Sequence, residues 1–251
     1  MNWLPPNGAL HGFAIDHLLR WNLTVLFWMF VAAQALLVAA LLRRRASGRE
    51  ELPARPRSGA AYFLADVLPL AAITALYLWM VVTSHKLWAA SRETAADPHA
   101  VQVEVTGVQF DWYFRYPGAD GVFGTTRPDL INAPAGNPLG LDPADPHAAD
   151  DIVSAVLMLP AGRPVDITLR SIDVIHGFSI PGMRLKQDAI PGMTGHLEFT
   201  PTVPGDYPIL CTQVCGLGHY RMQARLRVVA PADYDRWLAG REHVVAAEAR
   251  P

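Results

Sequence analysis

The sequence predicts a membrane-anchored all-β protein, in which an N-terminal two-helix transmembrane hairpin precedes an external β-domain. Three observations lead to this fold class. Two long apolar runs without charged residues lie in the first 90 residues, an arginine-rich stretch separates them, and short alternating segments bounded by Gly and Pro follow Trp88. Long apolar runs are typical of membrane spans, whereas short alternation is typical of half-buried strands.

The first apolar run covers residues 23–42 and follows an external N-terminal segment, residues 1–22. The run contains no charged residue. At a rise of about 1.5 Å per residue it is long enough to cross a hydrocarbon core of about 30 Å. Residues 1–22 lack the pattern of a cleavable signal peptide, so we expect the first span itself to insert the chain into the membrane.

The connector, residues 43–59, is basic, whereas the segment before the first span has only Arg20. Its arginines are Arg43, Arg44, Arg45, Arg49, Arg55 and Arg57. The positive-inside rule places this loop in the cytoplasm, and the second span, residues 60–84, then returns the chain. Both termini would face the periplasm of a bacterium. The alternative, two buried helices of a soluble protein, does not explain the arginine-rich loop.

The external domain, residues 85–230, reads as several short strands with turns between them, which suggests a sandwich or barrel. The expected strands are 101–105, 108–116, 152–159, 165–169, 174–180, 194–200, 205–210 and 222–229. The C-terminal segment, residues 231–251, has Tyr234, Trp237 and Leu238 at helical spacing and predicts a short packing helix followed by a tail.

An acidic insert, residues 117–151, interrupts the strands. It contains six aspartates against the single Arg127, and the chain from Lys86 onward has 14 Lys and Arg against 19 Asp and Glu. The insert is expected to be an ordered surface loop or lid, or else disordered. The negative charge either steers a basic partner or only keeps the domain soluble. No basic stripe is present, so nucleic-acid binding is not expected.

The stretch Cys211–Met222 places two cysteines, a histidine and a methionine within a dozen residues. Thiolate, imidazole and thioether donors suit copper electron-transfer centres rather than structural zinc. Two thiolates four residues apart can bridge a pair of copper ions. Such a pair needs a second imidazole, and His176 lies on a separate apolar segment. Gln213 offers its backbone carbonyl.

Two simpler interpretations stay open. The only two cysteines of the chain could form a local disulfide outside the cytoplasm, and His176 could be an ordinary core residue. A disulfide leaves His219 and Met222 unexplained. In the metal interpretation, Gly216 and Gly218 let the loop fold back on the metal, and Leu217 is expected to cover the site against water.

The loop Cys211–Met222, the segment Asp173–His176 and the segment Gly182–Gly192 together resemble subunit II of haem-copper cytochrome c oxidases. The resemblance runs from the first span to about Trp237. It implies a Greek-key cupredoxin β-barrel that holds a dinuclear copper A centre. The ligands that it implies are His176, Cys211, Gln213 through its carbonyl, Cys215, His219 and Met222.

The resemblance also implies the function and the partners. The copper A centre would accept electrons from cytochrome c, or another c-type cytochrome, and pass them to haem in subunit I of a proton-pumping terminal oxidase that reduces oxygen to water. This chain would bind two copper ions and no haem. It would be a multi-pass protein of the bacterial inner membrane, associated with subunit I and with subunit III.

The chain departs from the family pattern at three places. Phe110 stands where the family has its electron-input Trp, so Trp112, expected on the same strand face as Phe110, is a second candidate. Gln213 replaces a Glu that helps to bind Mg²⁺ at the subunit boundary, which makes that site doubtful because an amide is a weaker ligand. The family has a proton-uptake Glu about one turn before Asp66, where this chain has Tyr62, so Asp66 either takes up protons in its place or only extends to the membrane interface.

Other functions with related features are less compatible with the sequence. A membrane-anchored copper chaperone or thiol oxidoreductase could use the Cys-x-x-x-Cys pair, but the late position of the cysteines in a strand-rich region disfavours it. A quinol oxidase subunit II lacks the copper ligands. Nitrous oxide reductase shares the copper site and is not expected to carry the helical hairpin.

Overall fold

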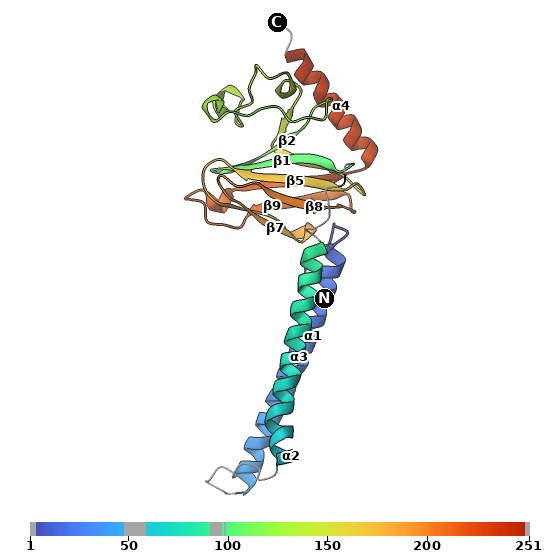
Figure 1. Cartoon of the computed structure of the whole chain (residues 1–251), viewed down its shortest axis with the longest axis vertical. Coiled ribbons are helices and arrows are strands. Elements are labelled where there is room, and N and C mark those ends of the chain that lie inside the picture. The colour runs from blue at the N-terminus through green and yellow to red at the C-terminus, as the bar shows by residue number, and fades with distance from the viewer. Residues whose placement is uncertain (1–3, 48–58, 91–96, 98, 249–251) are drawn as a thin grey trace. The chain divides into compact units, whose positions relative to one another are not determined.

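The structure of the chain is a computed structural model that describes residues 4–47, 59–90, 97 and 99–248 (Figure 1). Its described residues form two compact units. One is helical and covers residues 14–90, and the other, called here the β unit, combines residues 1–13 with residues 91–251. Each unit is described by itself.

The helical unit contains two helices that are long and apolar enough to cross a membrane. Helix α1 (Gly12–Ser47) extends beyond the predicted span 23–42 at both ends, since residues 13–22 contain no Pro or Gly to stop it. Helix α3 (Leu68–Ala90) follows α2 (Gly59–Tyr62) and a π-helical segment, Phe63–Val67. Most of the predicted cytoplasmic loop, residues 48–58, lies outside the described residues.

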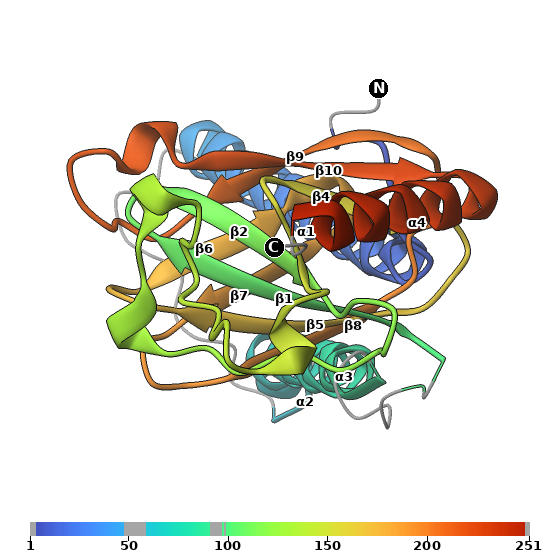
Figure 2. The same cartoon turned by 90° about the horizontal axis from the view of Figure 1, so that it is seen from above.

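The β unit is built from two five-stranded sheets (Figure 1, Figure 2). The first sheet has the spatial order β3 (Ile152–Ser154), β2 (Asp111–Tyr116), β1 (Val101–Val108), β5 (Val165–Ser171) and β8 (Gly195–Phe199). The second has the order β4 (Val156–Pro160), β10 (Gln223–Val229), β9 (Gly205–Cys211), β6 (His176–Ile180) and β7 (Leu185–Ala189).

Both sheets are mixed, since each contains antiparallel and parallel strand pairs. Strand β1 is antiparallel to β2 and parallel to β5, and β10 is antiparallel to β9 and parallel to β4. The predicted fold class, a membrane-anchored all-β protein with a two-sheet external domain, is confirmed.

Apart from shifts of one to three residues at strand ends, two predicted strands are divided and one strand was not predicted. The predicted strand 108–116 divides at a two-residue turn, Gln109–Phe110, that joins β1 to β2. The predicted strand 152–159 divides into β3 and β4, which belong to different sheets. Strand β7 was not predicted, because its central residues, Lys186, Gln187 and Asp188, are polar and do not alternate with apolar ones.

The core lies between the sheets and follows the alternation of the strands. Trp112, Phe114 and Tyr116 of β2 are at most 2% exposed and face Phe178 of β6 and Leu226 of β10 among other buried side chains. Helix α4 (Pro231–Glu248) closes one end of this core through Trp237, whose ring centroid lies 5.1 Å from that of Tyr116. The predicted C-terminal helix therefore has the packing role that its spacing indicated.

The N-terminal residues of the β unit form an extra edge on it. The backbone N–H of Leu10 donates to Thr200 at 3.0 Å, and the N–H of Thr202 donates to Gly8 at 2.7 Å. Ala9 is fully buried between them. The segment that precedes α1 is thus part of the β unit rather than a free terminus.

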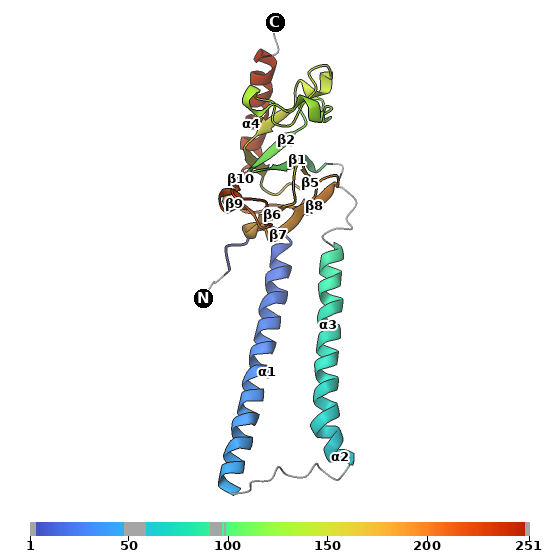
Figure 3. The ribbon, with the colours of Figure 1, turned by 90° about the vertical axis from the view of Figure 1, so that its left-hand side faces the viewer.

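The acidic insert is folded back on the first sheet. It contains three short 3-10 helices, Pro128–Leu130, Ala133–Ala135 and Pro146–Ala148. The insert and α4 both lie beyond β2, on the side away from β9 and β6 (Figure 1, Figure 3). Of the two expectations for this insert, the ordered loop matches the structure.

A buried cluster of charges, which we call the Arg115 cluster, ties the insert to the sheet. Arg115 is 2% exposed and lies 2.7 Å from Glu104 of β1 and 3.4 Å from Asp151 at the end of the insert. It also donates to the carbonyl of Gly124 at 3.0 Å, while the N–H of Gly124 donates to Asp151. Both arms of the insert therefore meet at one guanidinium.

Candidate metal centre

Two neighbouring strands of the second sheet and one loop bring the predicted ligands together. His176 begins β6 and Cys211 ends β9, and these strands are hydrogen-bonded neighbours. The loop after Cys211 passes through the 3-10 turn His219–Arg221 and returns at Met222, whose carbonyl accepts from the N–H of Cys211 at 3.1 Å. The loop is thus closed at its base.

The donor atoms of the six predicted ligands form one connected group. The sulfur of Cys215 lies 3.9 Å from the sulfur of Cys211, 3.6 Å from Nδ1 of His219 and 3.6 Å from the sulfur of Met222. The carbonyl oxygen of Gln213 lies 3.1 Å from the Cys211 sulfur. Donor atoms of His176, Cys211 and Cys215 lie within 4.8 Å of one another.

His176 provides the test of whether these residues fit a metal. Its side chain is fully buried, its Nε2 lies 2.8 Å from Oδ1 of Asp173, and its Nδ1 has no hydrogen-bond partner. A buried polar atom without a partner is unfavourable, and a metal ion would satisfy it. A carboxylate that holds the other ring nitrogen is the usual support of a histidine ligand. The donor set therefore fits a thiophilic metal, copper above all.

The two cysteines are free thiols in this structure. A sulfur separation of 3.9 Å is well beyond the S–S bond length of about 2.05 Å. Burial, followed by the neighbouring Cys211, raises the pKa of the Cys215 thiol to about 11. Since thiolates are the metal-binding form, a cation that binds here must displace a proton from Cys215.

The ring of Phe110 packs closely on the two loop glycines, a contact that the sequence did not predict. Gly216 has φ +136°, a conformation that favours glycine, and a Cβ at Gly218 would clash with the ring of Phe110. The expected cover, Leu217, is wrong, because this side chain is 97% exposed. The ring that packs on the loop comes instead from the β1–β2 turn.

The two aromatic candidates for electron input lie in different places. Phe110 is in the turn, so the predicted common strand face with Trp112 is wrong. Trp112 is 2% exposed, and its ring centroid is 5.8 Å from that of His176 and 5.2 Å from that of Phe178. Trp112 therefore lies inside the barrel beside a candidate ligand, and Phe110 lies against the loop near the surface.

Two residues that support the site, Gln109 and Asp173, were not predicted from the sequence. The backbone N–H of Gln109 donates to Oδ2 of Asp173 at 2.7 Å. Burial raises the pKa of Asp173, but hydrogen bonds from Gln109, His176 and Val174 outweigh burial and hold the pKa below its ordinary value. An Asp three residues before a candidate His ligand was the available signal for Asp173. Gln109 had none.

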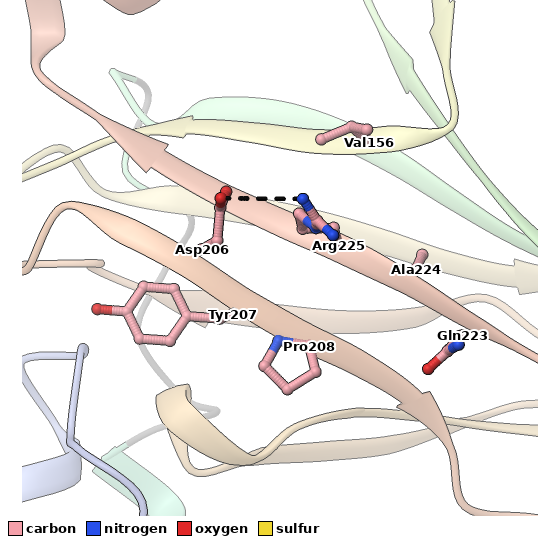
Figure 4. Close-up of a pocket in the computed structure, with 7 residues that line it drawn as sticks. All are labelled: Val156, Asp206, Tyr207, Pro208, Gln223, Ala224 and Arg225. Atoms are coloured by element: carbon pink, nitrogen blue, oxygen red, sulfur yellow. Dashed lines mark ion pairs between the residues drawn. The ribbon is translucent and has the colours of Figure 1, made fainter.

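Two further features do not belong to this cluster. Asp66 is in the π-helical segment of the helical unit and is exposed there. A shallow groove on the second sheet, between β9, β10 and β4, is crossed by an ion pair of 4.0 Å between Asp206 and Arg225 (Figure 4). None of the six predicted ligands lines this groove.

Comparison with known families decides the relationship that these residues indicate. The family described as "Cytochrome C oxidase subunit II, periplasmic domain" matches residues 101–229, which is more than half of the chain. The chain belongs to the cytochrome c oxidase subunit II family. The matched region contains both sheets, the candidate ligands and the acidic insert. The resemblance stated from the sequence is confirmed, and the protein is membrane-anchored with a periplasmic domain.

Individual members of the subunit II family are similar over somewhat more than half of the chain. The "Alternative cytochrome c oxidase subunit 2" of Bradyrhizobium diazoefficiens is 44% identical over 141 residues, which cover 55% of this chain and 50% of that protein. The "Cytochrome c oxidase subunit 2" of Synechocystis sp. is 33% identical over 149 residues, covering 59% of this chain and 35% of that protein. The chain thus spans half or less of the length of these two relatives.

The chain is also similar to solved structures, one of which is a periplasmic domain of the same family. It is the periplasmic domain of subunit II of cytochrome oxidase of Bradyrhizobium japonicum, which is 22% identical, covers 60% of this chain and 99% of its own, and has a TM-score of 0.44.

Proposed function

We propose that this chain is the electron-accepting subunit of a proton-pumping terminal oxidase, with a dinuclear copper A centre between β6, β9 and the loop Cys211–Met222. The observation that supports it is the buried, unpartnered Nδ1 of His176, which lies in one cluster with two free thiols. In this proposal the six donors are His176, Cys211, Gln213 through its carbonyl, Cys215, His219 and Met222.

The residues of this chain hold the donors in place and exclude water. Two bound copper ions would supply a shared one-electron carrier between cytochrome c and haem in subunit I. Asp173 orients His176 through Nε2, and the paired strands β6 and β9 hold the base of the loop. Trp112 packs against His176, and Phe178 packs against Trp112, so these rings keep that side of the site dry. A rigid donor set favours electron transfer because it rearranges little.

Metal analysis of the purified full chain tests this proposal. We expect two copper ions per chain, and their loss in Cys215→Ser and in His176→Asn. Met193→Leu, at an exposed methionine outside the loop, is the matched control for Met222→Leu and should keep both ions. One ion per chain, or a disulfide between Cys211 and Cys215 in the natively isolated loaded protein, would contradict the proposal.

The partners in this proposal are subunit I, subunit III and a c-type cytochrome. The excess of Asp and Glu in the chain after Trp88 would attract a donor with a basic face and raise its association rate. We therefore expect the rate of reduction by cytochrome c to fall as ionic strength increases. A rate that is independent of salt would show that the excess negative charge does not steer the donor and serves solubility instead.

Electron input is proposed to run through Trp112, with Phe110 as the second candidate. Trp112 packs beside His176, so Trp112→Leu should slow reduction of the copper-loaded chain while the copper absorption spectrum is unchanged. Phe110→Leu is the comparison variant. If Trp112→Leu is reduced at the normal rate and Phe110→Leu is not, the route passes through the turn instead.

Asp66 is proposed to take up protons near the cytoplasmic end of the second span. Its π-helical setting supports this, because π-helical turns are frequent at functional sites. In the assembled oxidase, Asp66→Asn should lower turnover and proton pumping together. Undiminished turnover and pumping in this variant would restrict Asp66 to an interfacial role.

The proposed topology is multi-pass in the bacterial inner membrane, with both termini and the copper domain periplasmic. A reporter that is active only in the periplasm should be active when fused after residue 248 and inactive when inserted at residue 52. The reverse pattern would contradict the orientation.

A further inference from the structure

The β1–β2 turn reaches from the first sheet to the loop of the metal centre, although all six candidate ligands belong to the second sheet and its loop. The turn consists of Gln109 and Phe110, between the register pair Val108 and Asp111. The ligand-bearing strands β6 and β9 have no hydrogen-bonded strand neighbour in the first sheet. Contacts from this turn are therefore a separate means of holding the loop.

Gln109 makes two hydrogen bonds with different targets. Its backbone N–H donates to Oδ2 of Asp173 at 2.7 Å, and Oδ1 of the same carboxylate lies 2.8 Å from Nε2 of His176. Its side-chain Nε2 donates to the carbonyl of Cys215 at 2.5 Å. One residue thus contacts the support of the buried histidine and the backbone of the second cysteine.

We propose that Gln109 is a positioning residue that sets the distance between the His176 side and the Cys215 side of the metal centre. This inference rests on the proposed function for its consequence, but its geometric content concerns this chain alone. The Cys215 carbonyl has no strand partner, because it lies in the loop between β9 and β10. Without the amide of Gln109, the loop is held at its base by the Cys211–Met222 and Thr212–Gly177 hydrogen bonds and over its tip by the Phe110 ring.

The chemistry of the side chain makes the inference specific to glutamine. Asn is one methylene shorter and cannot reach the Cys215 carbonyl while its backbone stays bonded to Asp173. Glu has the same length but presents acceptor oxygens to an acceptor carbonyl. Met keeps the length and removes the donor. The three variants therefore separate reach, charge and hydrogen bonding.

Hydrogen–deuterium exchange of the metal-free full chain is the direct test. The reporters are the N–H groups of Arg221 and Met222, which donate to Gly218 and His219 within the loop. A single hydrogen bond of ordinary net strength predicts an exchange increase of about 2- to 12-fold at these amides in Gln109→Met. Gln109→Glu should give a larger increase. The matched control is Gln102→Met, at the opposite end of β1, which should leave the loop unchanged.

The amides of β5 provide the internal reference. In Gln109→Met they should exchange at the wild-type rate, since the expected effect is local. If exchange rises throughout the β unit, the milder Gln109→Asn variant decides, and it must show the increase in the loop alone. Loop exchange at the wild-type rate in either correctly folded variant would overturn the inference.

A second measurement connects the inference to the metal. Copper-loaded Gln109→Met should lose its metal to a chelator several-fold faster than wild type and show a shifted copper absorption spectrum, whereas Gln102→Met should match wild type in both. The two proposals fail in different ways. Wild-type chain that binds no copper pair contradicts the proposed function, whereas normal copper content with unchanged loop exchange in Gln109→Met contradicts the role of Gln109.

Discussion

The two ends of strand β2 hold two different parts of the periplasmic domain by different interactions. At its start, the Gln109–Phe110 turn contacts the metal loop through a neutral amide and an aromatic ring. Near its end, Arg115 holds the acidic insert through buried ion pairs with Glu104 and Asp151. The first set of contacts lies partly at the surface, and the second is almost fully enclosed.

This difference predicts how each region responds to change. A neutral hydrogen bond contributes about 0.5 to 1.5 kcal/mol net, because water competes for both partners. Removing one member of a buried charge cluster costs about 3 to 5 kcal/mol, since a charge is left without compensation. The contacts of the loop can therefore be lost one at a time at a small cost in free energy. Loss of one charge in the Arg115 cluster should instead detach the whole insert from the sheet.

The largest expected effect is at the Arg115 cluster. Arg115→Met should lower the unfolding free energy of the full chain by about 3 to 5 kcal/mol and expose the insert to proteolysis, because Asp151 loses its cation and Glu104 keeps only the half-exposed Arg170 at 3.6 Å. Denaturation in detergent, followed by Trp fluorescence, measures this. Arg225→Met removes an arginine whose side chain is 61% exposed in its ion pair with Asp206 and should cost less than 1 kcal/mol. Equal effects of the two substitutions would contradict the comparison.

The next effect is a pH dependence that belongs to the insert side alone. Desolvation by burial, only partly offset by Arg115, raises the pKa of Asp151 to about 6. The folded chain therefore binds this proton more tightly than the unfolded chain, and the contribution of Asp151 to stability falls as pH rises from about 4 to 6. Two pKa units correspond to about 3 kcal/mol.

Asp151→Asn should remove this dependence. The unfolding free energy of the variant, relative to that of the wild type, should therefore rise by about 2 to 3 kcal/mol between pH 4 and pH 7. Denaturation curves at both pH values measure the difference. Asp129→Asn is the control of opposite sign, because the hydrogen bond from Arg127 lowers the pKa of Asp129 and the wild-type carboxylate stabilises the fold above that pKa. If Asp151→Asn shows the same pH profile as wild type, Asp151 is ionised throughout this range.

The smallest of the three effects is at the packing of Phe110 on the loop. Gly218→Ala places a methyl group against the Phe110 ring, and overpacking of this kind costs about 1 to 3 kcal/mol. Thermal denaturation and copper content of the full chain measure the effect. Adding Phe110→Ala to Gly218→Ala should recover part of the loss. Gly240→Ala, on α4 with open space around it, is the matched control and should be neutral or slightly stabilising.

Much of the fold was predictable because its signals are local in sequence. Charge-free apolar runs indicated the two long helices, and the alternation in residues such as Val165–Ser171 indicated strands with one buried face. Strand β7 was missed because Lys186, Gln187 and Asp188 obscure its periodicity. The division of residues 152–159 between two sheets depends on which neighbours each half meets, and no local pattern reports that.

The sequence by itself determined which atoms can bind a metal, because thiols, imidazoles and a thioether are properties of residue type, and their spacing from Cys211 to Met222 is written in the chain. Only the tertiary structure decided what holds them. Gln109 and Phe110 reach the loop from about a hundred residues away, Leu217 faces outward instead of covering the site, and Arg115 gathers both arms of the insert. The reason is physical: hydrogen bonds, packing and desolvation depend on distances between residues that only the folded chain brings together.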